Sequence, residues 1–251
     1  MAAHLLLEGI ELGLAAPGSS IVEIGSVREP SELPSSLYFA RLAERWGLRF
    51  LTVDFSERSW RLAQQYVGAQ AVFEDGRRFL EAFAETISVL YLDSFDYPYT
   101  PAHTRALQER CGDVYEEKGE ALTRERSAQV HEEQFLAALP KLGTPSWILI
   151  DNTHRQLGWG ARWWHPFFGK GERVIPEALR HGFQIEKEGL GGVLLGRSGQ
   201  RVGRPLQWVQ LYAGGGRTRF LYRALGAREP LVVRMDGAEA ESTAAHSDGS
   251  A

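Results

Sequence analysis

Short apolar runs alternate along the chain with segments whose apolar residues recur at the spacing of a helix. The runs are rich in β-branched residues, as strands buried on both faces of a sheet are. They lie at 20–24, 49–53, 71–73, 87–92 and 147–150. The helix-period segments lie between them, at 36–46, 59–67, 77–83 and 126–139. This alternation predicts βα units around a mostly parallel sheet that helices cover on both faces.

The pattern changes after residue 150. A helix is predicted at 172–181, and it ends at Gly182, a residue suited to the left-handed C-cap. Two runs at 183–188 and 192–196 flank a glycine-rich turn, which predicts an antiparallel pair. The expected fold is a doubly wound, Rossmann-like α/β domain, whose mostly parallel seven-stranded sheet has a closing antiparallel hairpin.

The predicted domain covers residues 1–236. It includes an N-terminal helical segment at 1–19 and a C-terminal extension at 198–236. The extension has apolar segments at 206–212 and 220–225, and the second is expected to be a helix or a subunit contact. The tail at 237–251 is small and polar, and we expect it to be disordered.

Composition narrows the partners. The 251 residues carry a formal charge of -4, so no basic field attracts nucleic acid, and a small molecule or a neutral polymer is the expected substrate. The only cysteine leaves no disulfide framework, which indicates a reducing compartment. Glu8 and Glu11 interrupt the first apolar run, and no later run reaches the ~18 residues of a membrane span. A cytoplasmic protein without a membrane partner is predicted.

An acidic residue and a glycine end the first predicted strand. Glu23 precedes Gly25 by two positions, and Ser26 follows. A glycine here lets the backbone turn tightly beside a ligand. The carboxylate can accept hydrogen bonds from an ammonium group or a water. This combination indicates a ligand-binding turn.

Acidic residues also follow the next two strands. Asp54 ends the second strand, where a carboxylate can receive both hydroxyls of a ribose, and Phe55 comes next. Asp75 and Gly76 follow the third strand. The NAD-binding loop G-x-G-x-x-G is missing, which disfavours a nucleotide-dependent oxidoreductase.

These motifs resemble those of the class I S-adenosylmethionine-dependent methyltransferases, whose first motif is an acidic residue, an apolar residue and glycine. The family also closes its sheet with an antiparallel pair. The resemblance implies S-adenosylmethionine as cofactor. Asp75 has two possible roles, contact with the adenine amino group or the N-cap of the next helix. The cofactor-binding residues that the resemblance implies are Glu23, Gly25, Ser26, Asp54, Phe55, Asp75, Gly76 and Asp93.

Oxygen ligands end the fourth and fifth strands. With Asp93 after one and Asp151-Asn152 after the other, the chain resembles metal-dependent O-methyltransferases of the catechol and caffeoyl-coenzyme A type. Macrocin-type sugar O-methyltransferases share a related arrangement. The resemblance implies one Mg²⁺ or similar divalent cation on these three residues, because hard oxygen ligands suit it. Such an ion lowers the pKa of a bound hydroxyl and aligns its oxygen with the methyl group. Carboxylates that serve the cofactor or cap helices are the alternative.

Two histidines are candidate general bases, beside Asp93 as a third catalytic candidate. His131 falls on the buried stripe of the segment 127–139, where a hydrogen-bonded core histidine is the alternative. His154 lies just past the predicted metal pair. The residues alone do not choose between them.

The loop at 158–171 is unusually aromatic. We interpret it as a wall or lid for a ring-containing substrate, or as a contact in a homodimer, which the C-terminal extension could also form. Its Gly169-Lys170-Gly171 turn lacks the spacing of a phosphate-binding loop.

The sequence therefore predicts an enzyme, an S-adenosylmethionine-dependent methyltransferase. Metal-assisted O-methylation of a small hydroxylated molecule, aromatic or sugar-containing, is the leading hypothesis. The alternatives are a metal-independent small-molecule methyltransferase with His131 or His154 as base, and a noncatalytic protein that binds S-adenosylmethionine.

Overall fold

The structure is a computed structural model, and it describes residues 18–29, 35–155, 167–189 and 191–197 together with the backbone of three strands within 206–234. The chain divides into two compact units, Met1–Val202 and Gly203–Ala251. Most of the predicted N-terminal helical segment, most of the aromatic loop and the predicted disordered tail lie outside the described residues. No helix of the described part is long and apolar enough to cross a membrane.

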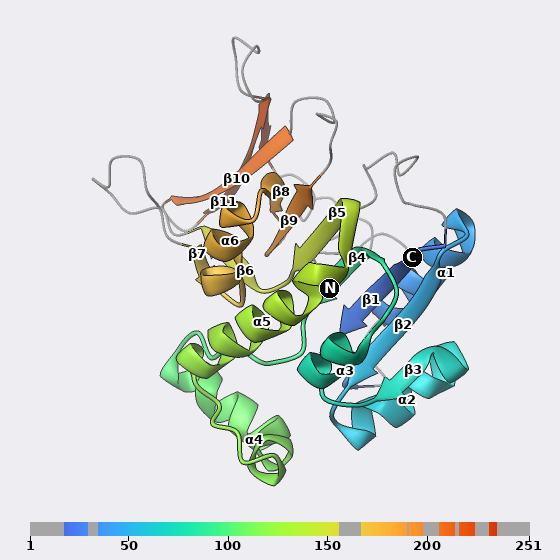
Figure 1. Cartoon of the computed structure of the whole chain (residues 1–251). Coiled ribbons are helices and arrows are strands. Elements are labelled where there is room, and N and C mark those ends of the chain that lie inside the picture. The colour runs from blue at the N-terminus through green and yellow to red at the C-terminus, as the bar shows by residue number, and fades with distance from the viewer. Residues whose placement is uncertain are drawn as a thin grey trace, which may run out of the picture. The chain divides into compact units, whose positions relative to one another are not determined.

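A seven-stranded sheet forms the centre of the first unit (Figure 1). Its parallel strands are β1 (Ser20–Ile24), β2 (Arg49–Asp54), β3 (Ala71–Phe73), β4 (Ile87–Leu92) and β5 (Leu142–Ile150). The antiparallel strands β8 (Gln184–Gly189) and β9 (Gly192–Arg197) close it beside β5.

The strand order is β3-β2-β1-β4-β5-β9-β8. The chain therefore builds outward from β1 in one direction and then continues from β4 in the other. Ligands of open α/β sheets bind at such a switch point, beyond the carboxyl ends of the strands. The predicted doubly wound sheet with a closing antiparallel hairpin is confirmed.

Six α-helices connect the described strands of this unit, together with the short turns η2 (Gly68–Gln70) and η3 (Leu139–Lys141). They are α1 (Ser35–Trp46), α2 (Glu57–Val67), α3 (Gly76–Ala82), α4 (Pro101–Glu117), α5 (Arg124–Ala138) and α6 (Gly171–Arg180). Two short strands, β6 (Thr153–Arg155) and β7 (Phe167–Gly169), pair with each other. The sequence patterns did not predict α4, β6 or β7.

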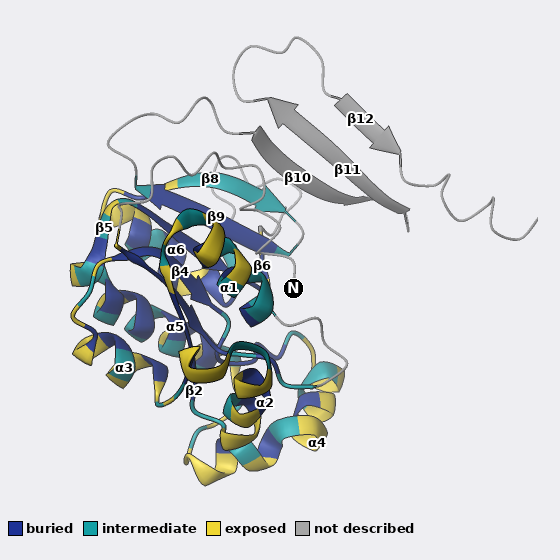
Figure 2. Ribbon diagram, turned by 90° about the vertical axis from the view of Figure 1, so that its right-hand side faces the viewer, coloured by how far each residue is buried: buried dark blue, intermediate teal, exposed yellow. Residues whose placement is uncertain are grey.

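The sheet separates two apolar cores, which alternate strand residues supply. Val22 and Leu90 pack in the core that α3, α5 and α6 share. Ile21 and Tyr91 pack in the core that contains Phe39 of α1. Figure 2 shows the strands buried between exposed outer helix faces. Burial on both faces explains why the strands appear in the sequence as nearly continuous apolar runs.

Side chains that precede the helices define where these helices begin. Ser56, Asp75, Thr100 and Thr123 each accept a hydrogen bond from the backbone N–H three positions later. This is the usual way to satisfy an unpaired N–H of the first turn. Lys170 precedes α6 and makes no such bond.

The second unit contains a three-stranded antiparallel sheet in the order β10-β11-β12. Its strands are β10 (Leu206–Ala213), β11 (Gly216–Arg223) and β12 (Leu231–Arg234). Strand β11 covers the start of the segment 220–225, so the helix expected there is wrong. The sequence predicted a single domain over 1–236 with a C-terminal extension. The division into two compact units does not test this, so it stays a prediction.

Candidate functional site

The strand ends that carry the predicted site residues lie side by side. The N–H of Gly25 donates to Val53 O at 2.8 Å, and the N–H of Asp93 donates to Ile24 O at 2.8 Å. The N–H of Asp151 reaches Leu92 O at 3.4 Å. The segments that follow β1, β2, β4 and β5 therefore form one continuous edge.

Gly25 lies where the segment after β1 passes the end of β4. Its φ is +91°, and a Cβ at this position would lie 2.5 Å from Asp93 O. Both the backbone conformation and the space therefore require glycine. Glycine here brings the first and fourth strand ends together.

Asp54 accepts three hydrogen bonds from neutral groups. Ser26 donates its N–H at 2.8 Å and its hydroxyl at 2.9 Å to Oδ2, and Ser56 N–H donates to Oδ1 at 2.8 Å. The residue is 8% exposed, and burial raises its pKa although the hydrogen bonds oppose the shift. A carboxylate has about four acceptor positions, so a bidentate ligand contact requires the Ser26 hydroxyl to rotate away.

Glu23 lies beneath this edge and not on it. The residue is 0% exposed, and the hydroxyls of Ser35 and Ser36 donate to its two carboxylate oxygens. Burial raises its pKa from 4.5 to about 7, against the effect of these hydrogen bonds. The contacts join β1 to the start of α1.

Asp75 is the N-cap of α3, because its carboxylate accepts the Arg78 N–H at 3.0 Å. This bears out the capping role, and the adenine contact stays a prediction. Gly76 begins α3 against β1, since a Cβ there would lie 2.3 Å from a methyl group of Ile24. Phe55 is half-buried and lies with Asp54 in the wall of a pocket.

The pocket beside Asp54 has a volume of about 60 Å³. Side chains from the segment after β1 and from α4 narrow it, among them Arg28, Arg110 and Tyr115.

Asp96 holds this narrowing cluster together. Its carboxylate pairs with Arg28, accepts the Tyr115 hydroxyl at 2.8 Å and lies 3.8 Å from Arg110. Burial alone would raise the pKa of Asp96, but the charges of Arg28 and Lys170, with the hydrogen bonds from Arg28 and Tyr115, together lower it. Sequence reasoning missed this cluster, because α4 has no apolar periodicity that marks it as a helix.

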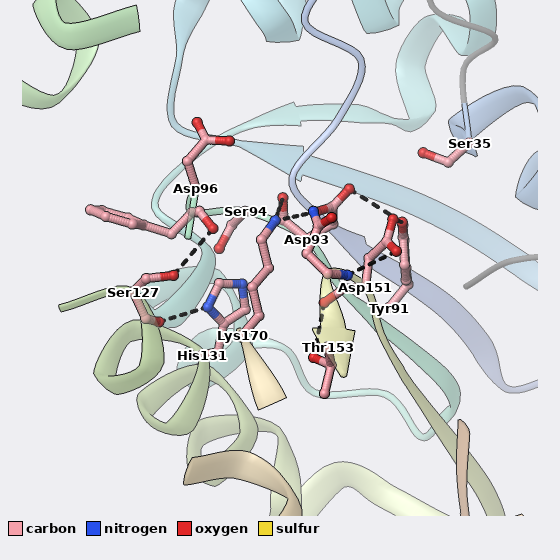
Figure 3. Close-up of polar contacts among 12 residues, drawn as sticks. Ser35, Tyr91, Asp93, Ser94, Asp96, Ser127, His131, Asp151, Thr153 and Lys170 are labelled. Carbon is pink, nitrogen blue, oxygen red and sulfur yellow. Dashed lines mark hydrogen bonds and ion pairs between the residues drawn. The ribbon is translucent and has the colours of Figure 1, made fainter. Parts of the chain in front are cut away.

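One of the predicted metal ligands, Asp93, pairs with a lysine in the structure (Figure 3). Lys170 Nζ donates to Asp93 Oδ1 and lies 3.3 Å from Asp93 O. The Tyr91 hydroxyl lies 3.2 Å from Asp93 Oδ2 and 3.0 Å from Asp151 Oδ2, so it bridges the two carboxyl groups. Burial alone would raise the pKa of Asp93, but the ammonium of Lys170 lowers it.

The third predicted ligand, Asn152, has an exposed side chain and a φ of +48°, a left-handed conformation that asparagine tolerates. Its carbonyl accepts the Lys170 N–H at 3.2 Å and the hydroxyl of Tyr99. Among the described residues, no three His, Cys, Asp or Glu side chains are grouped to hold a metal. The predicted Mg²⁺ site is not confirmed.

His131 is 0% exposed, and its Nδ1 lies 2.7 Å from Ser127 O. Within the part of the chain that the structure describes, its Nε2 has no hydrogen-bond partner. Burial, aided by the charge of Lys170, lowers the pKa of His131 to about 3, so the ring is neutral. His131 therefore lies on the buried side of α5, as predicted.

His154 lies on the surface of the edge, and burial lowers its pKa as well. Its ring lies 5.8 Å from that of Tyr99, and Tyr99 also contacts Phe168 at 5.6 Å. Tyr97 lies 5.2 Å from Phe168. These rings form an aromatic cluster beside Asn152, which we call the aromatic wall. Only its Phe168 belongs to the loop expected to be a wall or lid.

Comparison with solved structures gives partial superpositions. Streptomyces venezuelae DesVI superposes with a TM-score of 0.42 at 9% identity, over 78% of this chain and 90% of that chain. The N-methyltransferase NodS from Bradyrhizobium japonicum, solved with S-adenosyl-l-homocysteine, gives 0.40 at 14%, over 79% and 86%. The Bacillus cereus O-methyltransferase in complex with SAH gives 0.31 at 16%, over 53% and 49%.

This chain spans about half the length of the Bacillus cereus protein, 49%, and of TrmN from Thermus thermophilus, 48%. No protein-family model and no curated protein matches the chain. The fold class therefore rests on the strand order of the chain itself.

Proposed function

We propose that this chain is an S-adenosylmethionine-dependent methyltransferase. One observation carries the proposal: Asp54 ends β2 directly beside the Gly25 turn that ends β1, at the switch point of the sheet. A carboxylate beside a close backbone turn at this point suits the ribose of a nucleoside cofactor.

The residues at the edge fit such a cofactor. Asp54 would accept the ribose hydroxyls, with Ser26 and Ser56 holding its orientation. Phe55 offers a ring face to the adenine. Glu23 acts indirectly, because it joins the start of α1 to β1 beneath the turn.

The acceptor would lie over the β4–β5 part of the edge. S-adenosylmethionine supplies a methyl group on a sulfonium, which an oxygen or nitrogen nucleophile can attack. The aromatic wall fits a ring-containing small molecule. His154 is the better-placed base of the two histidines, because His131 is fully buried.

Metal-assisted methyl transfer is less well supported than metal-independent transfer. It requires Asp93 and Asp151 to face a divalent ion, whereas Asp93 pairs with Lys170. A noncatalytic cofactor-binding protein stays an alternative. It would be favoured if the chain binds the cofactor but methylates no hydroxylated aromatic or sugar-containing acceptor. The cytoplasmic location and the homodimer also stay predictions.

Thermal unfolding with S-adenosylhomocysteine and, separately, with NAD tests the proposal. At ~100 times its dissociation constant, a ligand of the native state adds roughly 2.7 kcal/mol to the free energy of unfolding. We expect S-adenosylhomocysteine to raise the melting temperature and NAD to leave it unchanged. Stabilisation by NAD alone would contradict the proposal.

A further inference from the structure

We propose that the ammonium of Lys170 takes the place of a divalent cation at the end of β4, so that chemistry at this edge is metal-independent. The ammonium contacts both the carboxylate and the backbone carbonyl of Asp93. Tyr91 then links Asp93 to Asp151. Lys170 is thus a positioning residue for the carboxylate that faces the ligand edge.

Burial makes the pairing of Lys170 compulsory. Its side chain is 1% exposed, whereas that of Asp93 is 26% exposed. Lys170 also precedes the first turn of α6, where the helix dipole disfavours a positive charge. A buried ammonium in such a position persists only with a charged partner. The carboxylate of Asp93 is that partner.

The backbone around Lys170 is built for this placement. Gly169 has a φ of +113°, and a Cβ there would lie 2.0 Å from Asn152 O. Thr153 Oγ1 accepts the Gly171 N–H at 2.8 Å and donates to Asp151 O at 3.0 Å. The two glycines on either side of Lys170 therefore dock against the segment after β5. Anchored in this way, the side chain of Lys170 reaches Asp93, which lies 77 positions earlier in the chain.

Charge then disfavours a metal ion at the same place. The lysine neutralises one of the two carboxylates, and a divalent cation that bound Asp93 would lie next to a buried positive charge. A divalent ion needs Asp93 freed from Lys170, and the 1% exposure of Lys170 leaves its ammonium no alternative contact with water.

Titration of the intact protein with Mn²⁺, followed by the EPR signal of the free ion, tests the proposal without an acceptor. The variants are Lys170→Met, which removes the charge at similar volume, Lys170→Arg, which keeps the charge, and Lys170→Met with Asp93→Asn. We expect no uptake by the wild type or by Lys170→Arg at submillimolar Mn²⁺. Lys170→Met should bind one Mn²⁺ at least about tenfold more tightly than the wild type, a difference of about 1.4 kcal/mol. The double variant should lose this binding.

Two results would overturn the proposal. One is tight uptake of a single Mn²⁺ by the wild type that Asp93→Asn abolishes. The other is a folded Lys170→Met variant that binds Mn²⁺ no better than the wild type. If Lys170→Met does not fold, Mn²⁺ uptake by the wild type still decides, because one tightly bound ion would overturn the proposal and no uptake is the expected result. The assignment of a ligand edge rests on the proposed function, which binding of S-adenosylhomocysteine by the same samples tests. The proposed function and the role of Lys170 can therefore fail separately.

Discussion

Two carboxylates at the same sheet edge are held in opposite ways. Asp54, at the end of β2, accepts hydrogen bonds from uncharged groups of Ser26 and Ser56, and burial raises its pKa against the charge of Arg28. Asp93, at the end of β4, pairs with an ammonium that lowers its pKa against the effect of burial. At Asp54 the neutral donors and the charge of Arg28 do not fully offset burial, whereas at Asp93 the charges of Lys170 and Arg28 together do. The first region is suited to ligand hydroxyls, and the second already contains its own cation.

The largest effect should follow from leaving the buried cation without its partner. Asp93→Asn strands the ammonium of Lys170, and removal of one member of a buried pair costs about 3 kcal/mol or more. Lys170→Met should cost less, about 1 kcal/mol, because Asp93 is 26% exposed and keeps contact with water. Urea unfolding measures both. Equal losses of unfolding free energy in the two variants would contradict the claim that Lys170 depends on the pair more than Asp93 does.

Each region also depends on a glycine at a close approach. Gly25→Ala and Gly169→Ala place a Cβ 2.5 Å and 2.0 Å from backbone oxygens, so each should cost about 2 kcal/mol or more. Gly47→Ala is the matched control, since its φ is +65° but no atom lies within 4 Å of the added Cβ. It should cost about 1 kcal/mol. Melting temperatures that fall equally in all three variants would show that close approach adds nothing to the backbone strain.

The fold could be predicted from local pattern because apolar runs and helix periods are local properties. Strands β1, β3 and β4 have the predicted bounds, and β5 begins earlier than the predicted 147–150. Helix α4 was missed because its sequence, PAHTRALQERCGDVYEE, has few apolar residues and only three buried ones, Leu107, Gly112 and Tyr115. Strands β6 and β7 are too short for an alternating pattern to show.

Only the residues that follow the parallel strands could be predicted to share a site. Parallel strands bring Gly25, Asp54, Asp93 and Asp151 to one edge whatever their side chains do, so their convergence followed from the topology. The partner of Asp93 did not, because Lys170 is distant in sequence and reaches it through turns that close only in the folded chain. The glycines that flank Lys170 were the one available signal.

The two regions should also differ in how pH acts on stability. Glu23 has a folded pKa of about 7 against 4.5 unfolded, so its contribution is greatest below pH 4.5 and is lost as the pH rises through 7. Asp93 has the opposite pH dependence. Because its pKa is lowered in the folded state, it stabilises the fold above pH 3.8, and this stabilisation is lost as the pH falls further. Unfolding free energies between about pH 5 and pH 8 should show Glu23→Gln gaining on the wild type as the pH rises. Parallel curves would contradict this.

Calorimetric titration of S-adenosylhomocysteine into Asp54→Ala and Asp151→Ala tests most directly whether the cofactor lies over the β1–β2 region. Asp54→Ala removes a charged acceptor of ribose hydroxyls, so binding should weaken by about 1.5–3 kcal/mol, roughly tenfold or more. Asp151→Ala, over the β4–β5 region, should bind as the wild type does. Unchanged affinity in a folded Asp54→Ala variant, or equal losses in both variants, would contradict the placement of the cofactor beside Asp54.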